Sequence, residues 1–369
     1  MPRLACGGWF SIGPPPRSAD ARISAGQRAA LSTSVVGKPL GSPSVLGDGA
    51  PAVLDSLAGY QFVEGERPNP AAGEVLIKVA ACGVGYVDAL VALGRYQVKP
   101  SLPHTPGQEV AGWVQAVGGS VSAFSLGDRV MAPVRGGFAE YAIAQARATT
   151  AIPDRMSFAQ AAGFRINYLT ALHGLRDRGA VRAGENVLVF GAAGGVGSAA
   201  VQVAKLLGAR VVAVASTDEK RAFCSALDAD AALDTAKEGW RDRLKDLVGP
   251  AGLNVVFDPV CGPLFEPAFR SPAWGGRRLV VGFVGGIPAL AASLPLMKGA
   301  SLTGVDVRQF LLFEAPLAAA HLSELVSWVA DGRLSPPEGR KFGLDDFAAA
   351  LEFALEGAGK GKTILEIAT

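Results

Sequence analysis

Short apolar runs alternate with helical patterns between residues 187 and 307. The run VLVFG (187–191) precedes a segment whose apolar residues recur three and four positions apart (195–207), and a second apolar run follows (210–215). The same alternation predicts further strands at 231–234, 253–257, 278–283 and 301–307, and helices near 218–227, 238–248 and 264–270. Strands this apolar need cover on both faces, so the pattern predicts an α/β fold with a doubly wound parallel sheet.

The chain before residue 176 has a different pattern. Glycine and proline separate short stretches that predict the strands of a compact β-rich domain, at 74–84, 109–118, 128–133 and 138–144. Residues 156–175 then show helical spacing, and the end of the chain adds helices and a last strand at 362–367. A β-rich domain is therefore expected beside the parallel sheet.

The first fifty residues differ from the rest in composition. They hold four arginines and seven serines but only two acidic residues, Asp20 and Asp48. An arginine- and serine-rich, acid-poor leader is typical of an organelle transit peptide, whereas a disordered extension or a misassigned start fits equally well. Residues 1–50 are therefore expected to be a leader or a disordered extension. A mitochondrial location follows from the first interpretation and a cytoplasmic one from the second.

The overall composition argues against several classes of protein. Of the 369 residues, 49% are hydrophobic and 18% are charged, and the net charge of +2 gives no basic excess for nucleic acid or an anionic membrane. Two uncharged stretches have the length of a membrane span, but glycines interrupt 187–204 and prolines interrupt 279–297, so no membrane segment is expected. The four cysteines and three histidines lack the spacing of a local zinc site or a disulfide framework.

The glycine-rich turn GAAGGVG (191–197) follows a predicted strand and opens a predicted helix. Compared with the pattern G-x-G-x-x-G, Ala192 takes the first place, and Gly194 and Gly197 take the second and third. Glycine in the second place lets the backbone approach a pyrophosphate, and glycine in the third lets the helix pack closely on the strand. The residues of this turn expected to bind a dinucleotide are Gly194, Gly195, Val196 and Gly197.

Cofactor choice depends on the end of the second strand, where the sequence reads AVASTDEKR (213–221). A carboxylate there would bind the ribose 2′-hydroxyl and repel a 2′-phosphate. Ser216 stands at that place, and Lys220 follows one helical turn later. A hydroxyl and a cation suit a 2′-phosphate, so NADPH is favoured over NADH. Asp218 argues against this choice, and a plain exposed position is the alternative for Lys220.

An ordered set of motifs resembles the medium-chain dehydrogenase/reductase superfamily. The motifs are GRYQVKPSLPHTPGQEVAG (94–112), SLGDRV (125–130), GGFAEYA (136–142), NYLTALHGL (167–175), GAAGGVG (191–197), DPVCG (258–262) and GGRRLVVGF (275–283). Within that superfamily the chain is most similar to the zinc-free quinone oxidoreductase branch that includes zeta-crystallin. The resemblance extends from about residue 70 to the C-terminus.

The resemblance implies two domains with the active site in the cleft between them. A GroES-like catalytic domain would span 51–168 and be completed by 305–369, and a Rossmann domain that binds NADP would span 169–304. Zinc-dependent members of the superfamily have a cysteine and a histidine where this chain has Gly85 and Gln108, and neither glycine nor glutamine is a good zinc ligand. No metal is therefore expected.

The resemblance also implies roles for single residues. Tyr96 matches a tyrosine that related enoyl-thioester reductases place beside the substrate as proton donor or orienter, and an aromatic ring packed at the domain edge is the alternative. Gly85 and Leu90 depart from close relatives, which have Asn and often Tyr there, so one wall of the substrate pocket is expected to differ. The residues matched to the nicotinamide half of the cofactor are Asn167, Val260, Gly282 and Phe283.

The expected reaction is therefore hydride transfer from NADPH to a quinone or an α,β-unsaturated carbonyl compound, in which the developing charge spreads without a metal. The alternatives are an enoyl-thioester (enoyl-CoA or enoyl-ACP) reductase and a zeta-crystallin-like cofactor-binding protein with little turnover. The strand SLTGVDV (301–307) is apolar with little charge to protect a sheet edge, which predicts a homodimer joined there. A nucleic-acid partner is not expected.

Overall fold

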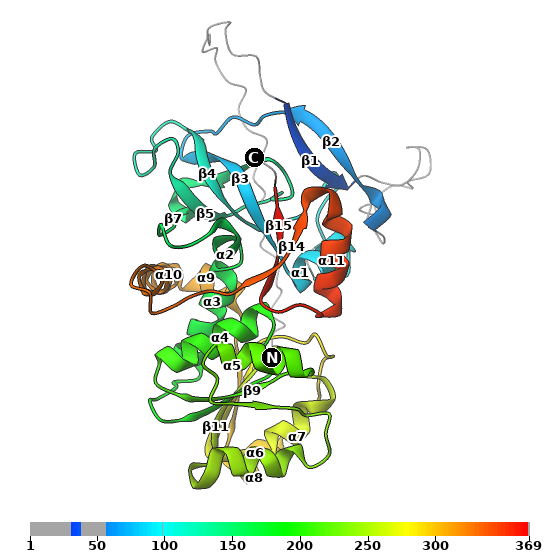
Figure 1. Cartoon of the computed structure of the whole chain (residues 1–369), viewed down its shortest axis with the longest axis vertical. Coiled ribbons are helices and arrows are strands. Elements are labelled where there is room, and N and C mark those ends of the chain that lie inside the picture. The colour runs from blue at the N-terminus through cyan, green and yellow to red at the C-terminus, as the bar shows by residue number, and fades with distance from the viewer. Residues whose placement is uncertain (1–30, 38–56, 98, 368–369) are drawn as a thin grey trace, which may run out of the picture. The chain divides into compact units, whose positions relative to one another are not determined.

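The computed structural model describes residues 31–37, 57–97 and 99–367 (Figure 1). In these residues a seven-stranded sheet has the order β14-β15-β3-β4-β5-β7, with β6 paired to β3. All its pairs are antiparallel except β14 with β15. The strands are β3 Glu74–Val84, β4 Glu109–Val117, β5 Arg129–Pro133, β6 Tyr141–Gln145, β7 Thr150–Ala151, β14 Glu338–Gly343 and β15 Lys362–Glu366. Strands from the end of the chain thus complete a sheet that begins near residue 74.

Helices α1 (Tyr86–Ala92) and α11 (Phe347–Glu356) cover this sheet. Figure 1 shows them side by side, α1 in cyan and α11 in red, although they are far apart in the sequence, and they contact each other. Their apolar residues share one buried cluster with alternate residues of β3. The GroES-like β domain expected from the sequence is confirmed.

Strand β1 (Leu31–Gly37) was not predicted, because it lies within the first fifty residues. It pairs antiparallel with β2 (Tyr60–Glu66), and its other edge bonds to the loop before β6, where the Val35 N–H donates to the Phe138 carbonyl oxygen at 2.9 Å. Val35 is fully buried. The assignment of all of residues 1–50 to a leader or extension therefore needs correction at 31–37, where β-branched residues outweigh the serine-rich composition. The rest of that range lies outside the described residues.

A second sheet, with six strands in the part of the chain described, is parallel throughout and has the order β10-β9-β8-β11-β12-β13. The strands are β8 Asn186–Val189, β9 Arg210–Val214, β10 Ala231–Leu233, β11 Leu253–Asp258, β12 Pro272–Val280 and β13 Ser301–Gly304. Numbered along the chain, this order is 3-2-1-4-5-6, the order of a Rossmann domain. The predicted doubly wound sheet is confirmed.

The continuous apolar character of these strands follows from burial on both faces. Val187 and Val189 of β8 belong to one buried cluster, and Leu188 and Phe190 belong to another. The helices of this half are α4 Gly195–Leu206, α5 Asp218–Ala226, α6 Trp240–Val248, α7 Phe265–Phe269 and α8 Ser293–Lys298. Residues of α4 join the first cluster and residues of α6 and α7 join the second, so opposite faces of the sheet are covered.

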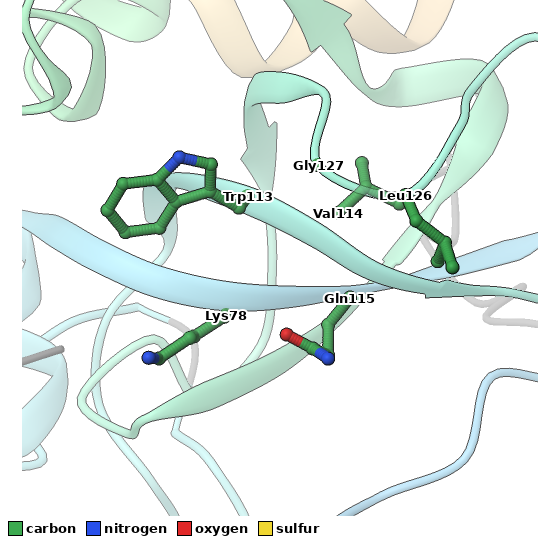
Figure 2. Close-up of a pocket in the computed structure, with 6 residues that line it drawn as sticks. All are labelled: Lys78, Trp113, Val114, Gln115, Leu126 and Gly127. Carbon is green, nitrogen blue, oxygen red and sulfur yellow. The ribbon is translucent and has the colours of Figure 1, made fainter.

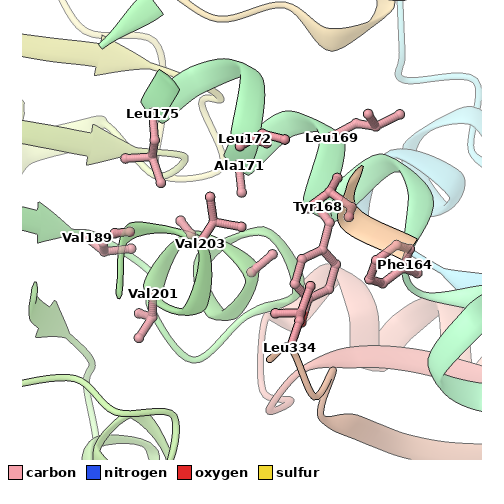
Figure 3. Packing of buried hydrophobic residues seen from close by; sticks show 14 of the residues in the cluster. Phe164, Tyr168, Leu169, Ala171, Leu172, Leu175, Val189, Val201, Val203 and Leu334 are labelled. Carbon is pink, nitrogen blue, oxygen red and sulfur yellow. The ribbon is translucent and has the colours of Figure 1, made fainter. Parts of the chain in front are cut away.

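The helix predicted at 156–175 is divided in the structure. It consists of α2 (Phe158–Ala162), α3 (Arg165–Leu172) and a π-helical turn, His173–Arg178. Gly163 ends α2, and α3 packs on α4 within the buried cluster of Figure 3, to which Val189 of β8 and Leu334 also belong. This packing connects the β-rich domain to the helix that follows the glycine-rich turn.

Two strand boundaries also differ from prediction. Strand β12 begins six residues earlier than expected and ends at Val280. Strand β13 ends at Gly304, because Asp306 caps α9 (Val307–Phe313) by accepting hydrogen bonds from the backbone N–H groups of Arg308 and Gln309. The long helix α10 (Ala315–Ala330) follows.

Short 3-10 helices connect the larger elements; they are η2 Leu57–Gly59, η3 Ala146–Ala148, η5 Gly249–Ala251, η6 Gly262–Leu264 and η7 Leu344–Asp346. Over the residues described, no single helix has the length and apolar character needed to cross a membrane. The bent pair α9 and α10 meets those two criteria only when its helices are taken together.

Candidate functional site

The glycine-rich turn lies at the carboxyl end of β8 and leads into α4. A Cβ atom on Gly197 would lie under 3.0 Å from the carbonyl oxygen of Gly191, so only glycine permits this approach of helix and strand. A Cβ atom on Gly194 would meet no atom closer than the Gly191 oxygen at 3.4 Å. Protein packing therefore explains the glycine at 197, whereas it does not require the glycine at 194, which stands at the N-terminus of α4, where a phosphate group would bind.

Asn167 of α3 lies against the first residue of α4. Its Nδ2 donates to the Gly163 carbonyl oxygen at 2.9 Å, and a Cβ atom on Gly195 would lie 2.7 Å from that same nitrogen. Asn167 is buried, and the neighbouring Val196 is half-buried. The structure thus brings together the asparagine and the turn that the sequence had suggested separately.

Val260 also lies beside the turn. Its Cγ2 would be 2.9 Å from a Cβ atom on Gly191. Asp258, at the end of β11, accepts hydrogen bonds from the N–H groups of Val260 (2.9 Å) and Cys261 (2.8 Å). Gly282 follows the end of β12 in a loop and approaches Pro259, and Phe283 beside it is half-exposed. These residues lie at the carboxyl ends of parallel strands, where ligands of such sheets bind.

A fully buried ion pair supports this loop. Arg278 of β12 donates to Asp258, and its guanidinium lies 4.1 Å from the ring centre of Phe265. Burial lowers the pKa of Arg278, and the Asp258 carboxylate opposes that shift. Cys261 has a positive φ of 58°, and burial raises the pKa of its thiol to about 12, so the thiol stays protonated at neutral pH.

The end of β9 carries the residues expected to select the cofactor. Ser216 is exposed, and Lys220 donates from Nζ to the Gly357 carbonyl oxygen at 2.8 Å. Asp218, the residue that argued against a phosphate site, bonds to Arg221 at 2.5 Å. Sequence reasoning missed Lys360, whose Nζ lies 2.5 Å from Glu219.

The glycine-rich tail 357–362 runs directly past the turn. The Gly361 N–H donates to the Ala193 carbonyl oxygen at 2.8 Å, and Gly361 forms a bridge with Gly194. Its two lysines, Lys360 and Lys362, were the available signal in the sequence. The residues that this tail contacts are distant from it along the chain, so motif spacing did not indicate that the two lysines lie near the turn.

The two positions that hold zinc ligands in other members of the superfamily share one carboxylate here. Asp88 accepts from the Gly85 N–H at 2.8 Å and from Nε2 of Gln108 at 3.1 Å. Glu109 is also buried, and its Oε1 accepts from the Ile166 N–H at 2.9 Å. Burial raises the pKa of Glu109, while nearby cations oppose that shift. Within the described residues, no group of three or more His, Cys, Asp or Glu side chains could hold a metal ion.

Tyr96 lies apart from these contacts. It is half-buried in the turn after α1, and its hydroxyl makes no hydrogen bond to another described residue. Leu90, the other predicted feature of the pocket wall, lies within α1. The role of Tyr96 therefore stays a prediction.

A shallow hollow of about 440 Å³ lies elsewhere, beside β3 and β4. Figure 2 shows Lys78, Trp113 and Gln115 on these strands and Leu126 on the adjoining loop. None of the predicted site residues lines it. A narrower space is lined by Asn167, Gly195, Ser198 and Lys362, and it adjoins the start of α4.

Comparison with known proteins assigns the family. Residues 71–154 match the alcohol dehydrogenase GroES-like domain, and residues 195–324 match the zinc-binding dehydrogenase family. Bovine (Bos taurus) quinone oxidoreductase-like protein 2 is 35% identical over 309 residues, which cover 83% of this chain and 88% of the relative. The chain belongs to the zinc-free quinone oxidoreductase branch of the medium-chain dehydrogenase/reductase superfamily. As a member of this branch it is an oxidoreductase.

Solved structures of the superfamily have the same fold. The quinone oxidoreductase of Thermus thermophilus, solved also with NADPH, is 30% identical, and the match covers 90% of this chain and 99% of that one with a TM-score of 0.75. The CurK enoyl reductase is 25% identical, and the match covers 91% and 100% with a TM-score of 0.79. The predicted branch and fold are confirmed.

Proposed function

We propose that this protein reduces quinones or α,β-unsaturated carbonyl compounds with NADPH and without zinc. The open glycine-rich turn beside Asn167 and Val260 carries this proposal, because it offers a nucleotide a backbone approach, a helix N-terminus and a wall at the nicotinamide side. The NADPH complex of the Thermus relative supports the choice of cofactor. When bound, NADPH would supply the hydride.

The residues at the former zinc positions support the choice of substrate. Gly85 has no side chain, and the amide of Gln108 donates to Asp88, so neither is a strong ligand for the metal ion that would polarise a simple ketone. In a conjugated acceptor the charge that follows hydride addition spreads over several atoms as an enolate or a hydroquinone. Such substrates need less stabilisation from the protein.

An enoyl-thioester reductase is the second candidate, favoured by the similarity to the CurK enoyl reductase. NADPH oxidation measured against 9,10-phenanthrenequinone, a simple enone and crotonyl-CoA separates the two. Preference for the quinone or enone supports the first proposal, and preference for the thioester supports the second. If NADPH is not oxidised with any of the three acceptors, the protein is instead a cofactor-binding protein with little turnover.

Replacement of Lys220 tests the cofactor preference. Lys220→Ala should weaken NADPH binding by about 1.5–3 kcal/mol, the value of one charge-assisted contact, and leave NADH binding nearly unchanged. Fluorescence titration with both cofactors measures this, with Lys245→Ala on the exposed face of α6 as the matched control. Equal losses for NADPH and NADH would contradict a 2′-phosphate contact.

Replacement of Tyr96 tests its role as proton donor. Tyr96→Phe keeps the ring and removes the hydroxyl, so turnover of an enone should fall roughly 10- to 100-fold if the hydroxyl bonds the developing enolate. A quinone should be affected less, because water can protonate a hydroquinone. Steady-state kinetics on one enone and one quinone decide between the roles, and unchanged turnover on both would make Tyr96 a packing residue.

The edge of the parallel sheet supports the expected homodimer. Among the described strands β13 pairs only with β12, and exposed apolar side chains belong to this part of the chain: Trp274, Ile287, Leu296, Met297 and Leu302. Light scattering should give twice the mass of one chain, and Leu302→Asp should halve it. Leu312→Asp, on exposed α9, is the matched control, and a monomeric unaltered protein would refute the dimer.

A further inference from the structure

The side chain of Lys362 extends along three glycines. A Cβ atom on Gly163 would lie 2.8 Å from Lys362 Cβ, one on Gly83 would lie 3.2 Å from its Cε, and one on Gly85 would lie 2.7 Å from its Nζ. From Cβ to the ammonium group, successive parts of the lysine side chain therefore lie beside Gly163, Gly83 and Gly85. A side chain at position 85 would therefore displace the ammonium, which stands where zinc-dependent members of the superfamily have a metal ligand.

Buried carboxylates surround this ammonium without neutralising it directly. Asp88 and Glu109 are both about 6% exposed, and the positive charge of Lys362 lowers the pKa of Glu109 against the effect of burial. Arg165 supplies a second positive charge to Glu109. Asp88 accepts hydrogen bonds from Gly85 and Gln108, and Glu109 accepts one from Ile166. Among the residues described, none accepts a hydrogen bond from Lys362 Nζ, so its donors are available to a ligand.

The position of Lys362 in the fold connects it to the nucleotide turn. It is the first residue of β15, and the preceding Gly361 bonds to Ala193 in that turn. It also lines the narrow space that Asn167 and Gly195 share. Lys362 thus lines the narrow space beside the turn, and its ammonium reaches the surroundings of Gly85 in the catalytic domain.

We propose that Lys362 is a catalytic residue whose ammonium stabilises the substrate oxygen that becomes negative during reduction, an inference that rests on the proposed function. Hydride adds to the β-carbon of an enone, the electron pair of the C=C bond shifts, and the carbonyl oxygen becomes an enolate oxygen. Lys362 donates a hydrogen bond to that oxygen and keeps its proton. A proton delivered to the α-carbon, with water as its ultimate source, completes the saturated carbonyl product.

The kinetic test compares Lys362→Met with the unaltered enzyme on one enone and one quinone. Loss of a donor to a developing oxyanion should lower kcat about 100- to 1000-fold with little change in KM, because the contact strengthens as charge builds. Lys362→Arg should restore part of the rate. The matched control is Lys341→Met on the neighbouring strand β14, whose ammonium already pairs with Glu338 and Glu366 and which should keep full activity.

A second measurement does not depend on turnover. 4-Nitrophenol bound to the full-length protein saturated with NADP⁺ should ionise about 1–3 pH units lower than in water, because its phenolate oxygen lies next to a cation. Absorbance titration should show this shift in the unaltered protein and in Lys341→Met, and its loss in Lys362→Met. Circular dichroism checks that each variant folds, and Lys362→Gln replaces Lys362→Met if the latter does not.

Two results would overturn the proposal. One is a Lys362→Met variant with kcat within about threefold of normal and an unchanged nitrophenol titration. The other is a variant that binds NADPH more than tenfold more weakly while nitrophenol ionises as before, which would assign the ammonium to the cofactor instead. Failure of the unaltered protein to reduce any quinone or enone would refute the proposed function, while the nitrophenol titration would still decide the role of Lys362.

Discussion

Replacement of Arg278 by methionine is expected to lower the free energy of unfolding by about 3–5 kcal/mol. The cost arises because Asp258, only 1% exposed, would lose the guanidinium that pairs with it in the interior. The N–H groups of Val260 and Cys261 would still donate to it, but they cannot replace a full positive charge. Urea unfolding followed by circular dichroism measures the loss.

Two controls make this result specific. Arg277→Met alters the preceding residue of β12, which pairs with partly exposed Glu185, and should cost about 1–2 kcal/mol. The double variant Asp258→Asn/Arg278→Met should regain most of the stability, because an amide oxygen can still accept from the loop and no buried charge remains. If Arg278→Met and Arg277→Met cost the same, the buried pair does not support the loop as inferred.

Adding one methyl group to the glycine-rich turn should change the stability of the fold at one position and not at another, while NADPH binding falls at both. Gly197→Ala forces a Cβ atom against the Gly191 carbonyl oxygen, so α4 must move, at a cost of about 1–3 kcal/mol in stability as well as lost NADPH binding. Gly194→Ala has room within the protein and a backbone φ of −77° that alanine accepts, so the fold should keep its stability. NADPH affinity should nevertheless fall at least about tenfold, because the methyl group blocks the approach of the pyrophosphate.

Thermal unfolding and fluorescence titration with NADPH separate the two effects. Gly343→Ala is a matched control, because a Cβ atom there meets nothing within 4 Å and its φ of −69° is ordinary. A Gly194→Ala variant with unchanged NADPH affinity would place the pyrophosphate elsewhere. A stable Gly197→Ala variant would show that the turn can shift without cost.

The parallel sheet could be predicted because its signal is local. Each strand is an unbroken apolar run, since both of its faces are buried, and each helix follows at once in the sequence. The strand boundaries were predicted wrongly where contacts between distant segments determine whether a strand forms or where it ends. Strand β1 exists because it pairs with β2 and with the loop at Phe138, and β13 ends early because Asp306 caps the next helix.

In the candidate site, too, the residues that are close together in sequence could be predicted and those brought together by the fold could not. The glycine-rich turn and Lys220 could be found because their residues are close together in sequence. Asp88 and Gln108, 20 positions apart, meet because Asp88 follows β3, Gln108 precedes β4, and these two strands pair. Lys362 and Gly85 meet because β15 lies antiparallel to β3 with Thr363 opposite Val84. No periodicity along the chain encodes a contact between residues separated by more than 270 positions, although the resemblance did indicate positions 85 and 108.

The return of the chain from the parallel sheet to the first sheet restricts how this enzyme can be recombined with its relatives. Strand β15 lies between β14 and β3, and the residue before it bonds to the nucleotide turn. A chimera made with a single crossover would therefore take β3 and β15 from different parents and mismatch both the sheet and the turn. Exchange of the parallel-sheet domain as an internal cassette, with one junction before β8 and one after β13, takes all strands of each sheet from one parent.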